Sequence, residues 1–372
     1  MKILFICSCL EKGFDGVGDY TRRLASAIIG KNNHAAVIAL NDKYAKDTFT
    51  GAQQESGTIV PVLRLPATLS LNARLIEARN YINQFNPDWV SLQFVIFGYH
   101  PKGLPFGLGR QLAKLGRGRR WHLMFHELWI GMASESPVKQ KYWGLLQKNI
   151  IKTLLLRLKP TVIHTHSTLY QAQLHKMGFK AGRLRLFGNI PVQNNQPTET
   201  TDPATKADKR FTLVIFGTIH PGAPIKQFAQ EVAAYANREK VQVLLKIVGR
   251  SGLELNHWVD EWRSAGLSVE ILGEQPVNII SKVLSEASVG ISSSAYFMIE
   301  KSGTTAAMLE HGLPVICVSG PYTPTGIPNL SLDPYIFEYK PGNFREYSKK
   351  LKAPVIKDRL DEVANQLCLS LK

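Results

Sequence analysis

The sequence lacks the cysteine pattern of a secreted, disulfide-stapled protein. Its 372 residues include only four cysteines, in apolar surroundings without zinc-site or disulfide-framework spacing: Cys7, Cys9, Cys317 and Cys368. We therefore expect a reducing, cytoplasmic setting. Long hydrophobic runs are missing too, since no stretch reaches the roughly 18 apolar residues of a membrane-spanning helix. The opening MKILFICSCL is too short an apolar run for a signal peptide and predicts a first β-strand.

Acidic residues are scarce in the first half of the chain. Residues 1–195 hold 26 Lys or Arg and 10 Asp or Glu, whereas residues 196–372 hold 19 of each, so the net charge of +16 lies in the first half. Residues 102–159 alone carry 12 basic and 2 acidic side chains. Such a field favours an anionic partner: a membrane surface, a nucleic acid or an acidic substrate. Residues 139–159 also carry aromatic and leucine side chains, which suits an interfacial membrane helix; a core helix with a solvated basic side is the alternative.

Apolar runs alternate with helical patterns along the whole chain. In the first half the runs are residues 2–9, 34–40, 89–94, 122–125 and 161–164, and residues 71–85 form a helical pattern between two of them. In the second half the runs are residues 211–217, 241–249, 267–273, 289–294 and 313–319. This alternation predicts parallel, doubly wound sheets of the α/β class.

A change of composition separates the two halves. Residues 193–209 are polar, contain two prolines and have no aromatic side chain, as is typical of a linker or a mobile loop. We expect a first domain over residues 1–192, this linker, a second domain over 210–340, and a helical tail over 341–372 that packs back on the first domain. Two such sheets predict a ligand-binding cleft between their carboxyl edges.

The segment from Tyr296 to Val318 carries the clearest single indication of a ligand site. A polar turn with Glu300 leads into a helical pattern that stops at Gly312. The start of that helix carries Ser302, Gly303, Thr304 and Thr305. Backbone N–H groups and the dipole at a helix start bind phosphates, although an ordinary capped helix would have the same sequence.

Other polar turns follow predicted strands and should share the same edges. The second domain has Lys226 and Arg250 there, and the first has His126 and the glycine turn with Gly16, Gly18 and Asp19. Glycines at this place allow a ligand to approach the backbone, but the third glycine of a dinucleotide fingerprint is missing. His164 and His166 face one side of a strand without a third metal ligand of the right kind, so we expect no metal.

Taken in order, these segments resemble the GT-B glycosyltransferases of the group-1, family-4 type. GVGDYTRRLA is similar to the family's glycine turn and first helix, MFHELW to its strand ending in histidine, and VIHTHS with FGNIP to the close of its first domain. LVIFGTIHPGAPIKQF is similar to the donor-domain strand and lysine loop, and LKIVG, ILGEQPVNIISKVLSEASVGISSS and GLPVI complete the order. The resemblance covers nearly the whole chain. It implies an α/β, GT-B architecture with two Rossmann-like parallel-sheet domains facing an interdomain cleft.

The resemblance also implies roles for the residues singled out above. It implies a retaining transfer of a sugar from a nucleoside-diphosphate sugar to a glycan, lipid-linked or small-molecule acceptor, with no further cofactor. His126 would lie against the donor sugar, and Glu300 would contact its hydroxyls or stabilise the reacting centre. Donor phosphates and nucleotide would be bound by Lys226, Arg250, Ser302, Gly303, Thr304, Thr305 and Glu310. The implied setting is polysaccharide biosynthesis in the cytoplasm, or peripherally at the inner face of the membrane, where residues 102–159 would meet anionic lipid.

Three departures from the family's pattern keep other hypotheses open. The family's second glutamate falls on Ala307 or Met308, with Glu310 nearby but out of step; Thr218 stands where arginine is usual; and Asp19 stands where glutamate or arginine is frequent. A nucleotide-sugar epimerase or an inactive nucleotide-sugar binder of the same fold remains an alternative. The charge alone suggests a basic nucleic-acid-binding protein, but no known nucleic-acid module is present, and we expect no such partner.

Overall fold

The computed structural model describes residues 1–193, 210–327 and 330–372, and the chain divides into two compact units. The first unit comprises Met1–Arg185, Thr323–Leu330 and Leu360–Lys372. The second comprises Leu186–Tyr322 and Ser331–Arg359. The predicted linker over residues 193–209 lies, apart from Gln193, outside the described residues.

In the described part of the first unit, eight strands form one sheet in the order β3-β4-β2-β1-β5-β6-β7-β8. Only β3 and β4 pair antiparallel; the other neighbours pair parallel. The strands are β1 Lys2–Cys7, β2 His34–Asp42, β3 Phe49–Glu55, β4 Thr58–Pro66, β5 Trp89–Phe94, β6 Arg120–Phe125, β7 Val162–Thr165 and β8 Gly182–Arg183. The central strands are near-continuous apolar runs because helices cover both faces of the sheet.

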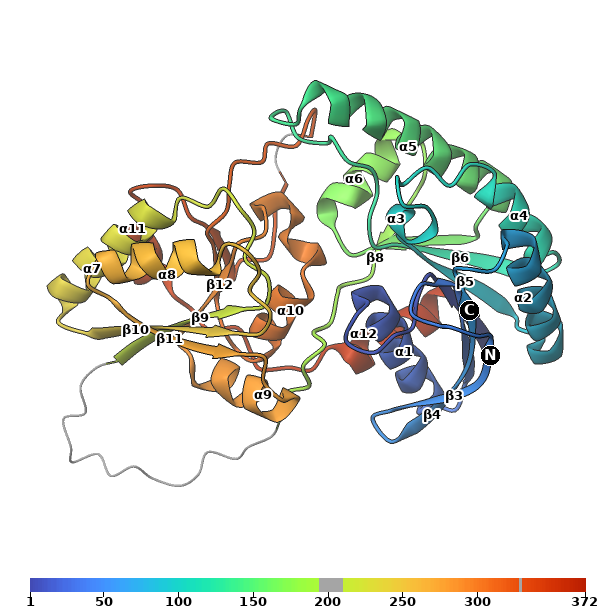
Figure 1. Ribbon diagram of the computed structural model, residues 1–372, viewed down its shortest axis with the longest axis horizontal. Coiled ribbons are helices and arrows are strands. Elements are labelled where there is room, and N and C mark those ends of the chain that lie inside the picture. Colours follow the sequence, from blue (N-terminus) through green and yellow to red (C-terminus); the bar gives the residue numbers. More distant parts are fainter. Residues whose placement is uncertain (194–209, 328–329) are drawn as a thin grey trace. The chain divides into compact units, whose positions relative to one another are not determined.

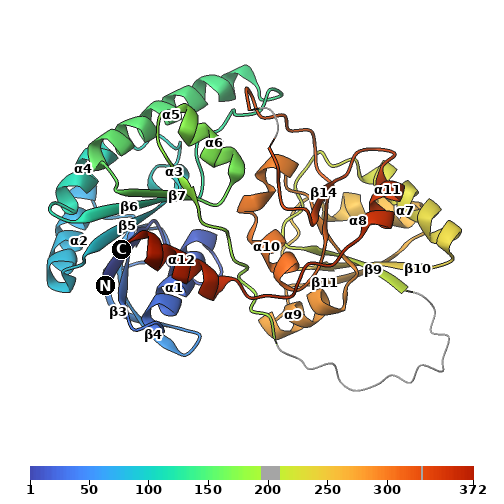
Figure 2. The same ribbon diagram turned by 180° about the vertical axis from the view of Figure 1, so that it is seen from behind.

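Helices flank this first sheet on two sides. They are α1 Gly16–Ile29, α2 Leu71–Phe85, α3 Ile96–Tyr99, α4 Leu108–Leu115, α5 Val138–Leu158, α6 Thr168–Lys176 and α12 Leu360–Ser370. Figure 1 shows α2, α4 and α5 along one side of the sheet and α1 with α12 along the other. The last helix, α12, packs against α1, as Figure 2 also shows from behind.

In the described part of the second unit, six parallel strands form a sheet in the order β11-β10-β9-β12-β13-β14. Its strands are β9 Arg210–Phe216, β10 Gln242–Val248, β11 Ser268–Gly273, β12 Val289–Ser292, β13 Val315–Cys317 and β14 Ile336–Glu338. Its helices are α7 Ile225–Glu239, α8 Leu255–Ser264, α9 Val277–Glu286, α10 Gly303–Glu310 and α11 Phe344–Lys350, with a short 3₁₀ helix, η1, at Tyr296–Lys301.

Two hydrophobic clusters cover the two faces of the second sheet. One joins the sheet to α7, α8 and α11 through large side chains such as Phe228, Trp258, Trp262 and Phe344. The other joins it to α9 and α10 through Leu284, Met308 and Leu309, among others. Each helix group therefore lies on its own face, and the sheet is doubly wound, as the sequence predicted.

Two segments differ from the sequence prediction. The hairpin β3–β4 was not predicted, because β3 is largely exposed and polar and β4 contains Pro61. The tail was predicted as one amphipathic helical element, but residues 351–359 lie between α11 and α12 without helix. Pro354 interrupts the helical pattern there, since proline lacks the N–H that an interior helical position needs.

Candidate functional site

The strand order of the second sheet marks one place on its carboxyl edge. From β9 the chain moves to β10 on one side and later returns to β12 on the other, so β9 and β12 flank the switch point. In doubly wound sheets, ligands bind outside the carboxyl ends of the strands at such a point. The residues that follow β9 and β12 therefore lie where a ligand of this sheet would bind.

The loop after β9 is held by its neighbours on both sides. The backbone N–H of Ile219 donates to the carbonyl of Ser251, after β10, at 2.9 Å. The backbone N–H of His220 donates to Oγ of Ser293, after β12, at 2.8 Å. Three loops from three neighbouring strands are thus tied together at the switch point.

Gly217 brings this loop against the start of helix α10. Its φ is +85°, and a Cβ placed on it would lie 2.9 Å from Cγ2 of Thr304. Any side chain here would therefore be strained in its backbone and would also clash. Glycine is therefore favoured here by its positive φ and by the methyl group of Thr304 beside it.

Helix α10 begins with a side-chain cap. Oγ of Ser302 accepts from the backbone N–H of Thr305 at 3.2 Å, and the Thr305 hydroxyl donates to Oγ of Ser292 at 3.3 Å. In the first turn of a helix the N–H groups of Gly303 and Thr304 have no intrahelical acceptor. They lie at the positive end of the helix dipole, which is a suitable place for an anion.

Lys226 and Glu300 stand at the same edge of the second sheet. Lys226 is exposed and is the second residue of α7, the helix that follows β9. Glu300 lies partly buried in η1, between β12 and the Ser302 cap. Glu300 and Ser302–Thr305 thus follow β12, and Lys226 lies in the first turn of the helix that follows β9; these are the two strands that flank the switch point.

Arg250 and Glu310 are placed differently. The Arg250 side chain is 59% exposed and its Nε lies 3.5 Å from a carboxylate oxygen of Glu274. Glu310 is buried at the far end of α10, roughly 10 Å along the helix axis from Gly303. Its two oxygens accept from the backbone N–H groups of Gly188 at 3.1 Å and Arg359 at 3.4 Å. The carboxylate of Glu310 therefore holds backbone segments of the second unit and does not point to the Ser302 turn.

The predicted glycine turn of the first unit is the beginning of a helix. Helix α1 starts at Gly16, and its cap Asp15 accepts from the N–H of Gly18 at 2.7 Å. A Cβ on Gly18 would lie 2.4 Å from the carbonyl oxygen of Cys9, so here glycine serves internal packing. Asp19 accepts from the N–H of Gly13 and pairs with Arg22. Its carboxylate therefore has a structural partner on both sides.

His126 follows strand β6 and its ring is buried. Nε2 lies 2.9 Å from Oε1 of Gln93, and Nδ1 lies 2.9 Å from Nε2 of His166. Burial and the neighbouring His166 lower the pKa of His126 well below its usual value, so the ring is neutral near pH 7. Both ring nitrogens are thus engaged within the protein, and sequence reasoning missed Gln93 because no motif connects strand β5 to this histidine.

The buried histidines interact in two pairs. His164 lies 3.1 Å from His122 and His166 lies 2.9 Å from His126, so each ring of the predicted pair contacts a different histidine. Among the described residues, no three His, Cys, Asp or Glu side chains gather closely enough to hold a metal ion.

The described part of the chain contains no helix with the length and apolar content needed to cross a bilayer.

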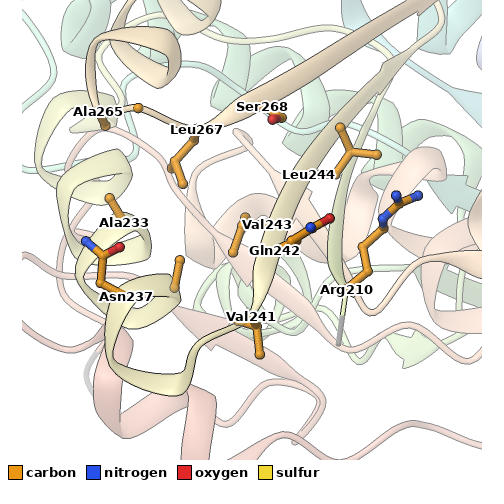
Figure 3. A pocket seen from close by; sticks show the side chains of 12 residues that line it. Arg210, Ala233, Asn237, Val241, Gln242, Val243, Leu244, Ala265, Leu267 and Ser268 are labelled. Carbon is orange, nitrogen blue, oxygen red and sulfur yellow. The ribbon is translucent and has the colours of Figure 1, made fainter. Parts of the chain in front are cut away.

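A cavity of about 470 Å³ lies at the opposite edge of the second sheet (Figure 3). It is lined by the beginnings of β9, β10 and β11, including Arg210, Gln242 and Ser268. Ligands of doubly wound sheets bind at the carboxyl edge, and this cavity is at the amino edge. The polar groups at the switch point are therefore a better candidate for the ligand site than this cavity, despite its size.

No protein-family profile matches the chain, and no curated protein sequence matches it. Solved structures do match. The Anabaena protein Alr3699/HepE, in complex with UDP and glucose, has 15% identity and a TM-score of 0.54 over 98% of this chain and 95% of its own. Starch synthase IV of Arabidopsis thaliana, bound to ADP and acarbose, has 12% identity and a TM-score of 0.53 over 99% and 98%.

UDP-GlcNAc 2-epimerase of Neisseria meningitidis, bound to UDP-GlcNAc, is similar to the same extent. It has 10% identity and a TM-score of 0.52 over 100% of this chain and 99% of its own. At such identities the likeness concerns the fold. The predicted α/β, GT-B fold with two Rossmann-like sheets is confirmed: this chain has the fold of GT-B glycosyltransferases.

Proposed function

We propose that this protein is a glycosyltransferase that takes a sugar from a nucleoside-diphosphate sugar and passes it, with retention, to a glycan or lipid-linked acceptor. The observation that carries the proposal is the meeting of the Gly217 loop with the start of α10 at the switch point of the second sheet. A diphosphate there would accept from the N–H groups of Gly303 and Thr304. The exposed ammonium of Lys226 would balance its charge.

The chemistry explains why these groups suit the reaction. The bond between the anomeric carbon and the diphosphate oxygen breaks, a bond to the acceptor oxygen forms, and the proton of the acceptor hydroxyl passes to the leaving diphosphate. Positive charge develops at the sugar carbon and negative charge on the leaving diphosphate. Donors fixed beside the leaving oxygen stabilise this charge in the transition state without reorganising. Glu300 would contact the sugar hydroxyls or the developing positive charge.

The similar solved structures support a nucleotide ligand, but they include both glycosyltransferases and an epimerase. HepE is described with UDP and glucose, the starch synthase with ADP and acarbose, and the Neisseria enzyme is an epimerase bound to UDP-GlcNAc. The family's second glutamate position is occupied by Ala307 or Met308, both fully buried. An epimerase or an inactive binder is therefore the second candidate.

Product analysis after incubation with a panel of UDP-, ADP-, GDP- and dTDP-sugars distinguishes these reactions. Transfer to an added acceptor with release of nucleoside diphosphate supports the proposal, and the configuration of the product tests retention. A donor sugar changed at one carbon, without release of the diphosphate, would instead establish an epimerase.

A thermal-shift screen locates the nucleotide independently of turnover. We expect a nucleoside diphosphate to raise the melting temperature of the wild type and to lose most of this effect in Lys226→Ala. The matched control is Lys282→Ala, an exposed lysine of α9 that pairs with Glu286. Equal shifts in wild type, Lys226→Ala and the control would contradict the proposed phosphate site.

We further propose that the acceptor is met at an anionic membrane surface. Helix α5 exposes apolar side chains between basic ones: Tyr142 is 68% and Leu145 is 55% exposed, and Lys139 and Lys141 are exposed as well. Phe106, just before α4, is 69% exposed. Exposed aromatic and leucine side chains beside lysines are the composition of an interfacial helix, whereas a helix with a merely solvated face would expose polar groups.

Co-sedimentation with vesicles tests this surface. We expect binding to vesicles with anionic lipid, weakened by salt, and little binding to neutral phosphatidylcholine. The double variant Leu145→Ser with Leu146→Ser should lose it, whereas Ile76→Ser, an exposed apolar residue of α2, should not. Binding to DNA on a filter but not to vesicles would overturn the membrane proposal.

A further inference from the structure

A chain of hydrogen bonds runs through the buried side of β5, β6 and β7 in the first unit. It connects seven groups in the order His164, His122, Ser91, Gln93, His126, His166 and the carbonyl of Leu184. The successive heavy-atom distances are 3.1, 2.8, 2.8, 2.9, 2.9 and 2.9 Å. All six side chains are at most 7% exposed.

The sequence pattern and the strand register explain this alignment. Side chains at i and i+2 lie on the same face of a strand. Ser91 pairs in register with His122, and Met124 pairs with His164. Alternate positions of three adjacent strands therefore face the same side. Tyr20 of α1 covers that side, with its ring 4.9 Å from His126 and 5.1 Å from His166.

The carbonyl of Leu184 determines where the protons of the two nearest rings lie. A carbonyl only accepts, so Nδ1 of His166 carries a proton. If His166 is neutral, its Nε2 accepts and Nδ1 of His126 donates. If His126 is also neutral, its Nε2 must in turn accept a hydrogen bond from the Gln93 amide.

The Gln93 amide has two orientations, which correspond to two proton counts. In the first orientation Oε1 of Gln93 faces Nε2 of His126, and both ends of the His126–His166 pair then face acceptors. The two rings then need three protons and carry one positive charge. In the second orientation the amide is turned so that Nε2 faces His126. The two rings then need only two protons and are both neutral. Every hydrogen bond from His164 to the carbonyl of Leu184 can then have one donor and one acceptor, all pointing the same way.

We infer that Gln93 sets the donor-to-acceptor direction of these hydrogen bonds. Its Nε2 donates to His126 and holds that ring as the neutral tautomer with its proton on Nδ1. His126 is then a positioning residue rather than a direct ligand of the sugar, because both of its ring nitrogens are engaged. This role rests on the proposed function, in which His126 and Glu127 begin the loop after β6. Burial, which lowers the pKa of all four histidines, agrees with the neutral form.

Nitrogen-15 NMR of histidine-labelled full-length protein at pH 7.5 tests the inference directly. The long-range couplings of each ring distinguish a proton on Nδ1 from a proton on Nε2. We expect Nδ1–H tautomers for His126 and His166, assigned by His→Asn variants. A proton on Nε2 of His126 in the wild type, or a doubly protonated ring, would overturn the inference without any activity assay.

Two substitutions distinguish an effect of Gln93 on the His126 tautomer from an effect on packing alone. In Gln93→Glu the carboxylate can only accept, so His126 must carry a proton on Nε2 and its tautomer or charge changes. In Ser91→Ala the chain is cut on the other side of Gln93, and the Nδ1–H tautomer of His126 should persist. The same ring state in Gln93→Glu as in the wild type would contradict the inference.

Activity adds a separate measurement. With a transferable donor identified, we expect Gln93→Glu to lower kcat about tenfold and KM little, while Ser91→Ala stays within about twofold. If no donor is turned over by the wild type, the proposed function fails, and the tautomers still decide the role of Gln93. If transfer occurs but the tautomers are not as expected, only the present inference fails.

Discussion

The carboxyl edges of the two sheets use similar strand architecture in opposite ways. In the first unit, side chains beside the ends of β5, β6 and β7 hydrogen-bond to one another, and both nitrogens of His126 are engaged. In the second unit, the ends of β9 and β12 lead to helix starts with N–H groups in their first turns and to the exposed Lys226. One edge is a closed polar network and the other offers donors to an anion. The difference shows that a polar residue after a strand is not by itself a ligand contact; its partners decide.

The largest effect is expected for Glu310, whose carboxylate we assign to holding backbone segments and not to binding a ligand. Glu310→Ala leaves the buried N–H of Gly188 and the part-buried N–H of Arg359 without their acceptor, which should cost about 4 kcal/mol of unfolding free energy. Urea unfolding measures this, with Glu286→Ala, exposed on α9, as the matched control. Full stability combined with a lost nucleotide shift would move Glu310 into the binding site.

Acid should weaken the first unit more than the second. Burial lowers the pKa of His164 and of His166 from 6.5 to about 4, so the unfolded chain binds more protons in this window. Stability is therefore full above about pH 6.5 and falls as the pH drops toward 4, by roughly 3 kcal/mol for each such histidine. Denaturant unfolding between pH 7.5 and 4.5 measures the slope.

A paired substitution sharpens this pH test. His164→Asn should flatten the slope because it removes one buried titrating ring, whereas His34→Asn, on an exposed position, should leave it unchanged. A slope that is the same in both variants as in the wild type would mean that the buried rings do not titrate as burial dictates.

A smaller loss of stability is expected at the carboxyl edge of the second sheet. Gly217→Ala introduces a Cβ at φ +85° and within 2.9 Å of Thr304, which should cost about 2 kcal/mol and displace the start of α10. We expect the thermal shift by nucleoside diphosphate to disappear with it. Gly266→Ala also has a positive φ but nothing within 4 Å, so it controls for backbone strain alone. Equal loss of the ligand shift in both variants would refute a specific role for Gly217.

The smallest effect is expected at Arg250. Its ion pair with Glu274 is solvated, since the two side chains are 59% and 72% exposed, so Arg250→Ala should change stability by less than about 0.5 kcal/mol. A thermal-shift titration with nucleoside diphosphate decides whether it also binds the ligand. A loss as large as that of Lys226→Ala would add Arg250 to the phosphate site.

Periodicity and composition were enough for the regular elements. Helix α2 at Leu71–Phe85 and strand β5 at Trp89–Phe94 have the bounds that the sequence predicted. Both are long, unbroken patterns whose apolar residues must face a core. The hairpin β3–β4 escaped prediction because an edge strand buries little and its polar sequence leaves no such pattern.

The helix start at Ser302 was also predictable, because a cap is a local event. Ser302 accepts from an N–H only three residues away, so sequence and geometry are linked directly. Glu310 and Gln93 were not predictable in this way. Their partners lie 122 and 33 residues away, and nothing in their immediate neighbours indicates these contacts.

The amino-acid sequence by itself determined the alternation of strands and helices, the basic first half and the capped turn at Ser302, because each depends on neighbours along the chain. Only the tertiary structure decided that Glu310 and Asp19 serve the backbone and that His126 is enclosed by His166 and Gln93. The reason is that a polar side chain takes whichever partner the folded chain brings within about 3 Å.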